Sequence, residues 1–342
     1  MKRLFCLLMA VCLLLGGCAI IPQQPETKQY TATFLNLFDT VTTIVGKADS
    51  KESFEATAQQ IHDHLLQYHQ LFDIYEEYEG IANLKTVNDA AGQAPVKVDR
   101  AIIDLLLDCK QYCHLTGGKV NVAMGSVLKL WHKARNDALN NPKTASLPDM
   151  AALQNAALHT SLEAVVIDEV NSTVQITDPM VQLDVGAIAK GWATLKVAEN
   201  APKGLLISVG GNVCATGPKD ENGTPWVIGV QDPDNSENYL HTLYVTNGSV
   251  VTSGDYQRKF MVDGNVYHHI IDPATLMPSL YWRSVSVVCP DSGLADALST
   301  ALFLLPLEEG QALLTRCQAE AMWVDANGQR YYSPGFEKMI RT

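Results

Sequence analysis

The sequence predicts an α+β fold, a single mixed α/β domain with a helical subdomain, preceded by a short export segment. Apolar residues follow helical spacing mainly between residues 50 and 160, and β-branched segments separated by turn residues dominate the second half. No linker-like stretch follows residue 30. The chain has 342 residues, 47% hydrophobic and 18% charged, which is enough apolar material for one large core.

The first residues have the pattern of a bacterial export signal. Lys2 and Arg3 precede an apolar stretch, residues 4–15, that is shorter than the roughly 20 residues of a membrane-spanning helix. The tetrad LGGC that ends at Cys18 resembles a lipobox, whose cysteine is lipidated after cleavage. We therefore expect a lipid anchor at the extracytoplasmic face of the bacterial cytoplasmic membrane; an ordinary signal peptide with an incidental cysteine is the alternative. The expected division is a signal peptide (1–17), a lipid-anchored linker (18–29) and a folded domain (30–342).

The first half of the domain is predicted to contain one strand and then helices. β-branched and aromatic residues predict a strand over 30–45, and helical spacing predicts a helix over 54–72. A second helix is expected over 100–115, with Asp99 as its N-cap and a Gly-Gly pair as its stop. Ser146-Leu147-Pro148-Asp149 resembles a capping box before a third helix.

The second half is predicted to be richer in strands. An Asp-Gly pair at 263–264 and an Asn-Gly pair at 327–328 each predict a tight hairpin. The other expected strands are 164–167, 174–176, 205–209, 226–230 and 242–245.

Charge and cysteine content argue against two classes of protein: broad nucleic-acid binders and disulfide-stabilised proteins. Lys and Arg number 25 against 37 Asp and Glu, a net charge of −12 that argues against broad binding to nucleic acid. A local basic pocket for an anionic ligand is still compatible with this balance. The five cysteines after Cys18 are too few and too scattered for a disulfide framework, and we expect Cys109 and Cys113 to pack in the core.

Residues 183–193 (LDVGAIAKGWA) place a carboxylate after an apolar strand and small residues before a helix. Small side chains let a ligand approach the backbone, and helix-start N–H groups attract anions. Lys190 can pair with Asp184 or with a phosphate; the alternative is a plain turn capped by Asp184. Gly210-Gly211 follows, but no GxGxxG or P-loop pattern is present, which excludes a Rossmann or Walker site.

Two further segments carry polar residues suited to catalysis. His268 and His269 follow the predicted hairpin, and one of them is placed to act as a base near neutral pH, unless both are structural. Asp296 and Thr300 are four residues apart and therefore share a helix face, where they offer two hard oxygen donors for Mg²⁺. The alternative is an Asp that interacts with the helix dipole and a Thr that bonds back to the backbone.

Together these segments resemble the ApbE family, the FAD:protein FMN transferases. The resemblance covers most of the chain after residue 30 and depends on five motifs in the family's order. They are DVGAIAKG (184–191), GGN (210–212), SGDY (253–256), HHIIDP (268–273) and ADALST (295–300).

The resemblance implies a Mg²⁺-dependent enzyme that cleaves FAD, transfers FMN through its phosphate to a threonine of an acceptor protein, and releases AMP. It implies Mg²⁺ ligands at Asp296, Thr300 and the carbonyl of Ala187, and a base at His269. The implied acceptor is a subunit of a membrane redox complex or an exported flavoprotein. The implied FAD contacts are Phe38, Tyr75, Lys119, Val120, Asn121, Asp184, Lys190 and Ile270.

The chain departs from the family pattern at three places. Phe38-Asp39-Thr40 stands where the family has Met-Gly-Thr, and Leu276 replaces a glycine, so the turn after HHIIDP is expected to change shape. Ser299 stands where some members carry a carboxylate, so the metal shell is expected to have one protein carboxylate. Two other functions are left open: an FAD pyrophosphatase that yields FMN and AMP, and a non-enzymatic FAD-binding lipoprotein.

Overall fold

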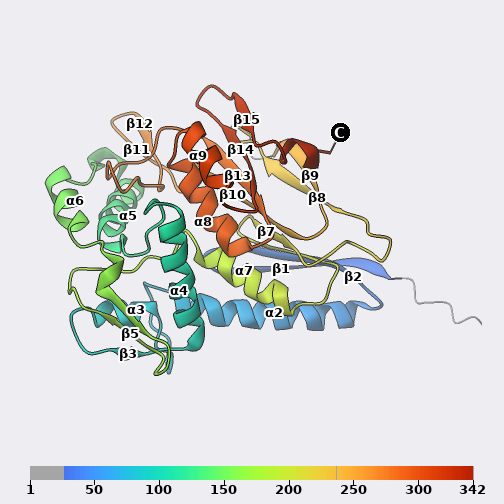
Figure 1. Ribbon diagram of the computed structural model, residues 1–342, viewed down its shortest axis with the longest axis horizontal. Coiled ribbons are helices and arrows are strands. Elements are labelled where there is room, and N and C mark those ends of the chain that lie inside the picture. The colour runs from blue at the N-terminus through green and yellow to red at the C-terminus, as the bar shows by residue number, and fades with distance from the viewer. Residues whose placement is uncertain (1–26, 236, 342) are drawn as a thin grey trace, which may run out of the picture.

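The centre of the protein is an eight-stranded antiparallel sheet in the order β1-β2-β6-β7-β10-β13-β14-β15 (Figure 1). The computed structural model describes residues 27–235 and 237–341, so the predicted signal peptide and Cys18 lie outside the described residues. The strand bounds are β1 (Lys28–Leu37), β2 (Thr40–Ala48), β6 (Leu205–Val209), β7 (Asn212–Ala215), β10 (Gly248–Gly254), β13 (Ser284–Cys289), β14 (Glu320–Val324) and β15 (Arg330–Tyr332).

The first two strands form a hairpin, so the prediction of one strand over 30–45 is wrong. Leu37 pairs with Thr40, and the two residues between them close the turn. Phe38 and Asp39 have φ of 51° and 52°, which is the left-handed conformation that a two-residue hairpin turn needs at both central positions. Such turns usually carry Asn-Gly or Asp-Gly, which is why the sequence Phe-Asp did not indicate one. β1 also begins at Lys28, inside the stretch predicted as linker.

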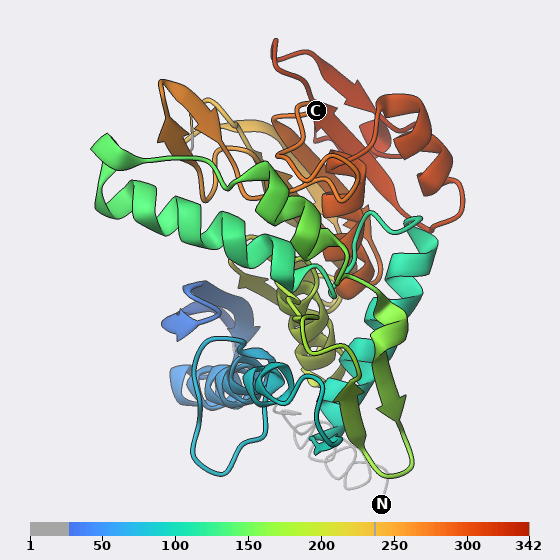
Figure 2. The ribbon, with the colours of Figure 1, turned by 90° about the vertical axis from the view of Figure 1, so that its left-hand side faces the viewer.

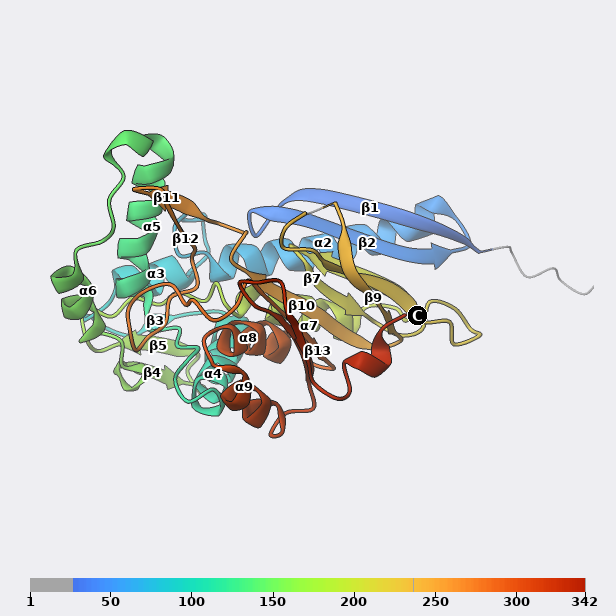
Figure 3. The ribbon, with the colours of Figure 1, turned by 90° about the horizontal axis from the view of Figure 1, so that it is seen from above.

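Helices cover one face of the sheet and a β-hairpin covers the other. Val251 and Val287 pack with the helices, whereas their neighbours Val250 and Val288 pack with the hairpin, as strand alternation requires. Figures 1 and 3 show α2 lying along β1 and β2. The covering elements are α2 (Lys51–Phe72), α7 (Ala189–Asn200), α8 (Ser292–Phe303) and, on the opposite face, β8 (Trp226–Gln231) with β9 (Tyr239–Val245).

Most of the remaining helices gather at one end of the sheet, in the region where a helical subdomain was predicted (Figure 2). The elements of this region are α3 (Leu84–Asp89), α4 (Arg100–Leu115), α5 (Gly125–Asn140), α6 (Met150–Ala157) and a small sheet of β3 (Val96–Lys97), β5 (Thr173–Ile176) and β4 (Val165–Asp168). Helices α3 and α4 share a core with the sheet, because Leu106, Trp192, Leu298 and Trp323 belong to one continuous cluster of buried side chains, whereas α5 and α6 pack in a separate cluster.

Local sequence signals mark most of the element ends. Asp99 caps α4 as predicted, since its Oδ1 accepts a hydrogen bond from Ala101 N at 2.8 Å. The prediction of a capping box that begins at Ser146 is wrong. Asp149 itself caps α6, and its side chain accepts a hydrogen bond from Ala152 N at 2.9 Å. The five other strands predicted in the second half are confirmed to within three residues at each end.

Both predicted hairpins are also confirmed. The second joins β14 to β15, and the first joins β11 (Phe260–Val262) to β12 (Asn265–Tyr267), which stops just before His268. Helix α9 (Leu307–Leu314) completes the C-terminal region. Among the described residues, no helix has the length and apolar character needed to cross a bilayer.

Candidate active site

A pocket of about 490 Å³ opens where the β1–β2 turn, the end of α2 and one face of α8 meet. The structure brings all the predicted site residues of the described range to its wall, although they come from segments far apart in the sequence. They are Phe38, Tyr75, Lys119, Val120, Asn121, Asp184, Ala187, Lys190, His269, Ile270, Asp296 and Thr300.

Asp296 is a buried carboxylate in the middle of α8. Its Oδ2 accepts hydrogen bonds from Gly191 N at 2.8 Å and from Asn212 Nδ2 at 2.9 Å, and Lys190 Nζ lies 3.9 Å away. Burial raises the pKa of Asp296 above its usual range, against the opposing effect of Lys190. The N-terminus of α8 is capped by Asp291, so the alternative in which Asp296 serves the helix dipole is wrong.

Thr300 lies one turn after Asp296 and lines the same pocket. Its neighbour Ser299 donates to the carbonyl of Asp296 at 2.9 Å and also contacts Ser253 Oγ at 2.8 Å. The side-chain hydroxyl of Thr300 makes no hydrogen bond with any described group, so the alternative in which it bonds back to the helix backbone does not hold there. Its hydroxyl is therefore available to a ligand in the pocket.

The segment before α7 presents backbone groups to the pocket. Asp184 Oδ1 accepts from Gly186 N at 2.9 Å and so caps its own turn, while α7 begins later, after Ile188. The residues before Asp184 are not a strand, because they form only an isolated bridge from Gln182 to Met124. Lys190 reaches back to the carbonyl of Gly186 at 3.3 Å.

The start of α7 leaves one carbonyl unused. Ala189 N donates to the carbonyl of Val185 at 2.9 Å, and Trp192 N donates to the carbonyl of Ile188 at 2.9 Å. The N–H of Gly191 would reach the carbonyl of Ala187 in a continuous helix, but it donates to Asp296 instead. The carbonyl of Ala187 is thus not taken by Gly191, and it lies at the pocket beside Asp296.

The two adjacent histidines have different roles. His268 is buried, with Nε2 at 2.7 Å from the carbonyl of Ser279 and Nδ1 accepting from Ile270 N at 3.2 Å, so both ring nitrogens are used structurally. His269 lines the pocket, and its Nδ1 is enclosed without a hydrogen-bond partner among the described residues. Burial, then the charge of Arg258, lowers the pKa of His269 to about 3, so its imidazole is neutral at physiological pH.

Two positions where this chain lacks an expected glycine keep a glycine-like backbone. Asp39 has φ of 52° and Leu276 has φ of 61°, both in the left-handed region. Leu276 is buried, and its carbonyl accepts a hydrogen bond from Trp131 Nε1 at 3.0 Å, which holds the strained residue in place. The replacement of glycine by Leu276 therefore does not by itself require a different turn.

Comparison with known proteins agrees with this geometry. The sequence model described as the ApbE family matches residues 38–323. A protein of Treponema pallidum (strain Nichols) named FAD:protein FMN transferase is 37% identical over 249 residues, which cover 68% of this chain and 67% of that protein. A protein of the same name from Klebsiella pneumoniae (strain 342) is 31% identical over 271 residues, 75% of this chain and 81% of that protein. The chain belongs to the ApbE family.

Solved structures of ApbE proteins share the fold. The crystal structure of the ApbE protein from Thermotoga maritima superposes with a TM-score of 0.81 at 29% identity, covering 92% of this chain and all of that one. The flavin transferase ApbE from Vibrio cholerae, at 22% identity, has a TM-score of 0.74 over 92% of this chain and shows the common fold alone.

Sequence reasoning missed several residues of this ApbE pocket. Nδ1 of His132, on α5, lies 3.0 Å from the hydroxyl of Tyr75, and Nε2 of His132 lies 4.0 Å from Asp184 Oδ2. The pKa of Tyr75 is raised to about 12, mainly by burial, so its hydroxyl keeps its proton at neutral pH. Arg258 also lines the pocket. His132 belongs to no motif, whereas the position of Arg258 two residues after SGDY was an available signal.

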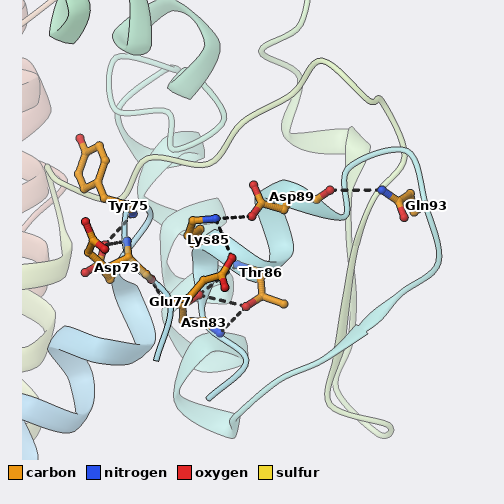
Figure 4. A network of polar contacts seen from close by, with 9 residues as sticks. Asp73, Tyr75, Glu77, Asn83, Lys85, Thr86, Asp89 and Gln93 are labelled. Atoms are coloured by element: carbon orange, nitrogen blue, oxygen red, sulfur yellow. Dashed lines mark hydrogen bonds and ion pairs between the residues drawn. The ribbon is translucent and has the colours of Figure 1, made fainter. Parts of the chain in front are cut away.

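The loop after α2 fixes Tyr75 at the mouth of the pocket. Asp73 Oδ1 accepts from the backbone N–H groups of Tyr75 at 2.7 Å and Glu76 at 3.1 Å. Figure 4 shows this contact in a polar network that continues through α3, with the ring of Tyr75 pointing away from it. Asn83 anchors the network, because it caps α3 and donates to the carbonyl of Glu76 at 2.8 Å.

Gly191 allows α7 and α8 to approach closely enough for the Asp296 contact. A Cβ there would lie 2.3 Å from the carbonyl oxygen of Ser292 and 2.5 Å from Asp296 Cβ. We expect Gly191→Ala to lower the free energy of unfolding by about 1–3 kcal/mol, as overpacking does, measured by urea unfolding. Glu199→Ala on the exposed side of α7 is the matched control, and equal stability of the two variants would contradict the close-packing argument.

Proposed function

We propose that this protein is a Mg²⁺-dependent FAD:protein FMN transferase that attaches FMN to a threonine of an acceptor protein and releases AMP. The names of its relatives support the class of reaction. The observation that carries the proposal is the placement of a partly unsatisfied carboxylate, a free hydroxyl and a neutral histidine in one pocket, at Asp296, Thr300 and His269.

The donor set fits a magnesium ion. Both hydrogen bonds to Asp296 go to Oδ2, which leaves Oδ1 available, and the hydroxyl of Thr300 and the carbonyl of Ala187 are unused as described above. All three are oxygen donors, and Mg²⁺ is commonly held by few protein ligands together with water and substrate phosphates. The described residues contain no group of three or more His, Cys, Asp or Glu side chains placed to hold a metal, which suits such a sparse site better than a zinc centre.

When bound there, Mg²⁺ would neutralise charge on the diphosphate. Asp296 would hold the ion while its Oδ2 stays fixed by Gly191 and Asn212. Lys119 and Lys190 supply positive charge at the pocket wall for the phosphates. The aromatic rings of Phe38 and Tyr75 provide apolar surface for the flavin.

His269 is the group placed to activate the acceptor hydroxyl. Because its Nδ1 is enclosed, Nε2 is the ring nitrogen open to the pocket, and it would take the threonine proton as the new bond to phosphorus forms. The lowered pKa keeps the imidazole neutral and ready to accept this proton, and the negative charge of bound FAD would strengthen it as a base by offsetting Arg258 and Lys190.

The decisive experiment is AMP release from FAD with and without an acceptor protein that carries a target threonine. We expect AMP to form only with Mg²⁺ and acceptor together, to stop when EDTA is added and to resume when Mg²⁺ is restored. The acceptor should gain the mass of one FMN. Equal AMP release without acceptor would instead establish an FAD pyrophosphatase, and FAD binding without AMP release would establish a non-enzymatic carrier.

A further inference from the structure

Arg258 is the cation of the pocket wall that has no carboxylate partner among the described residues. Lys119 Nζ lies 3.1 Å from Asp272 Oδ1, and Lys190 Nζ lies 3.9 Å from Asp296. Arg258 lines the same pocket but forms no ion pair or hydrogen bond through its side chain with the rest of the described chain. In a protein with 25 basic and 37 acidic residues, an unpaired guanidinium at a pocket is a candidate for binding an anionic ligand.

A second arginine lies close enough to Arg258 to feel its charge. The Nε of Arg135, on α5, is enclosed without a hydrogen-bond partner in the part of the chain that the structure describes. Burial, followed by the charge of Arg258, lowers the pKa of Arg135. Neither arginine forms an ion pair with a described carboxylate, so the two like charges leave a local positive potential that a bound anion would relieve.

This positive potential is directed at the proposed base. After burial, Arg258 has the largest effect on the imidazole of His269, and Arg135 acts in the same direction. Arg258 is also held with φ of 31°, a left-handed backbone conformation that is rare for an arginine, just before β11. Strain of this kind is found where the surrounding structure aims a residue at a functional site.

We propose that Arg258, supported by the field of Arg135, binds the phosphoryl group that is transferred and stabilises the charge that develops on it. This inference depends on the function proposed above. The acceptor hydroxyl oxygen forms a bond to the phosphorus of FMN while the bond from that phosphorus to the bridging oxygen breaks. The hydroxyl proton passes to His269, and AMP leaves with the bridging oxygen and its electron pair. The guanidinium donates N–H groups to the non-bridging oxygens, as arginines do in other phosphoryl transfers.

The test compares Arg258→Gln, Arg258→Lys and Arg135→Gln with Arg330→Gln, an exposed arginine on β15 that does not line the pocket. With FAD, Mg²⁺ and acceptor, we expect Arg258→Gln to lower kcat by about 10²-fold, because removing one fixed donor to a developing negative charge has an effect of this size. Arg258→Lys keeps the charge but not the bidentate geometry of the guanidinium, so its kcat should fall by less than that of Arg258→Gln. The kcat of Arg135→Gln should also fall by less. The dissociation constant for FAD, measured by flavin fluorescence, should change only a few-fold, and Arg330→Gln should match the wild type.

A second readout separates this role from a structural one. Because Arg258 lowers the pKa of His269, the imidazole resonances of His269 should titrate at higher pH in Arg258→Gln, as followed by NMR. Wild-type kcat in Arg258→Gln would overturn the inference while leaving the transferase function in place. A raised KM for the acceptor with unchanged kcat would overturn it too, by assigning the arginines to acceptor binding. If the wild type releases no AMP, the proposed function and this inference fail together.

Discussion

Replacing Asp296 by Asn should lower FMN transfer by roughly 10³-fold or more, because several kcal/mol of charge stabilisation in the transition state depend on the metal that this carboxylate would hold. The amide has nearly the same shape, and its oxygen still accepts from Gly191 N and Asn212, so the fold should be retained. The measurement is kcat for AMP release at saturating Mg²⁺, together with Mg²⁺ affinity from the concentration dependence of the rate.

Asp291→Asn on the same helix is the matched control for Asp296→Asn. It removes one negative charge five residues away, and asparagine caps a helix about as well as aspartate does. This control should transfer FMN at the wild-type rate. An Asp296→Asn enzyme of normal activity and unchanged Mg²⁺ dependence would remove the metal assignment from α8.

Replacing His269 by Gln should lower kcat for transfer by about 10²–10⁴-fold, the usual effect of losing a positioned general base. Binding of FAD should persist, because Lys119, Lys190 and the aromatic residues of the pocket are unchanged. His64→Gln, at an exposed position of α2, is the matched control and should be fully active. If His269→Gln loses FAD affinity and kcat to the same degree, His269 binds the substrate rather than activating the acceptor.

The pH dependence gives an independent check on His269. Its pKa is lowered to about 3 in the free protein, so the base form is already present throughout the neutral range. The profile of kcat/KM, which reports the free enzyme, should therefore show no loss centred near pH 6.5, where an ordinary histidine would take up its proton. Bound FAD offsets the neighbouring cations, so the acid limb of kcat should lie at higher pH than that of kcat/KM.

Periodicity and capping predicted the parts of this structure that depend on local interactions. Helix α4 begins after Asp99 and ends at the predicted residue, because the side-chain cap and the glycine pair each act on a helix end only a few residues away. The shared face of Asp296 and Thr300 also followed from helix geometry alone. What the spacing left open was whether Asp296 was a cap, and the tertiary contacts with Gly191 and Asn212 answer that question.

The features that sequence did not reveal depend on long-range packing. The turn at Phe38–Asp39 uses left-handed residues that neighbouring strands hold in place, so no local signal marked it. The choice between His268 and His269 depends on the carbonyl of Ser279, which a turn brings back beside the chain. The approach of α5 to the pocket, which supplies His132, likewise becomes visible only when the whole domain is folded.

The pocket draws on both the beginning and the end of the domain, from Phe38 in the first hairpin to Leu304 after α8. A chain that lacks α8 has neither Asp296 nor Thr300. If the proposed function holds, such a chain lacks two of the proposed metal ligands and cannot cleave FAD. On that function, flavin transfer begins only after α8, near the end of the chain, has been made.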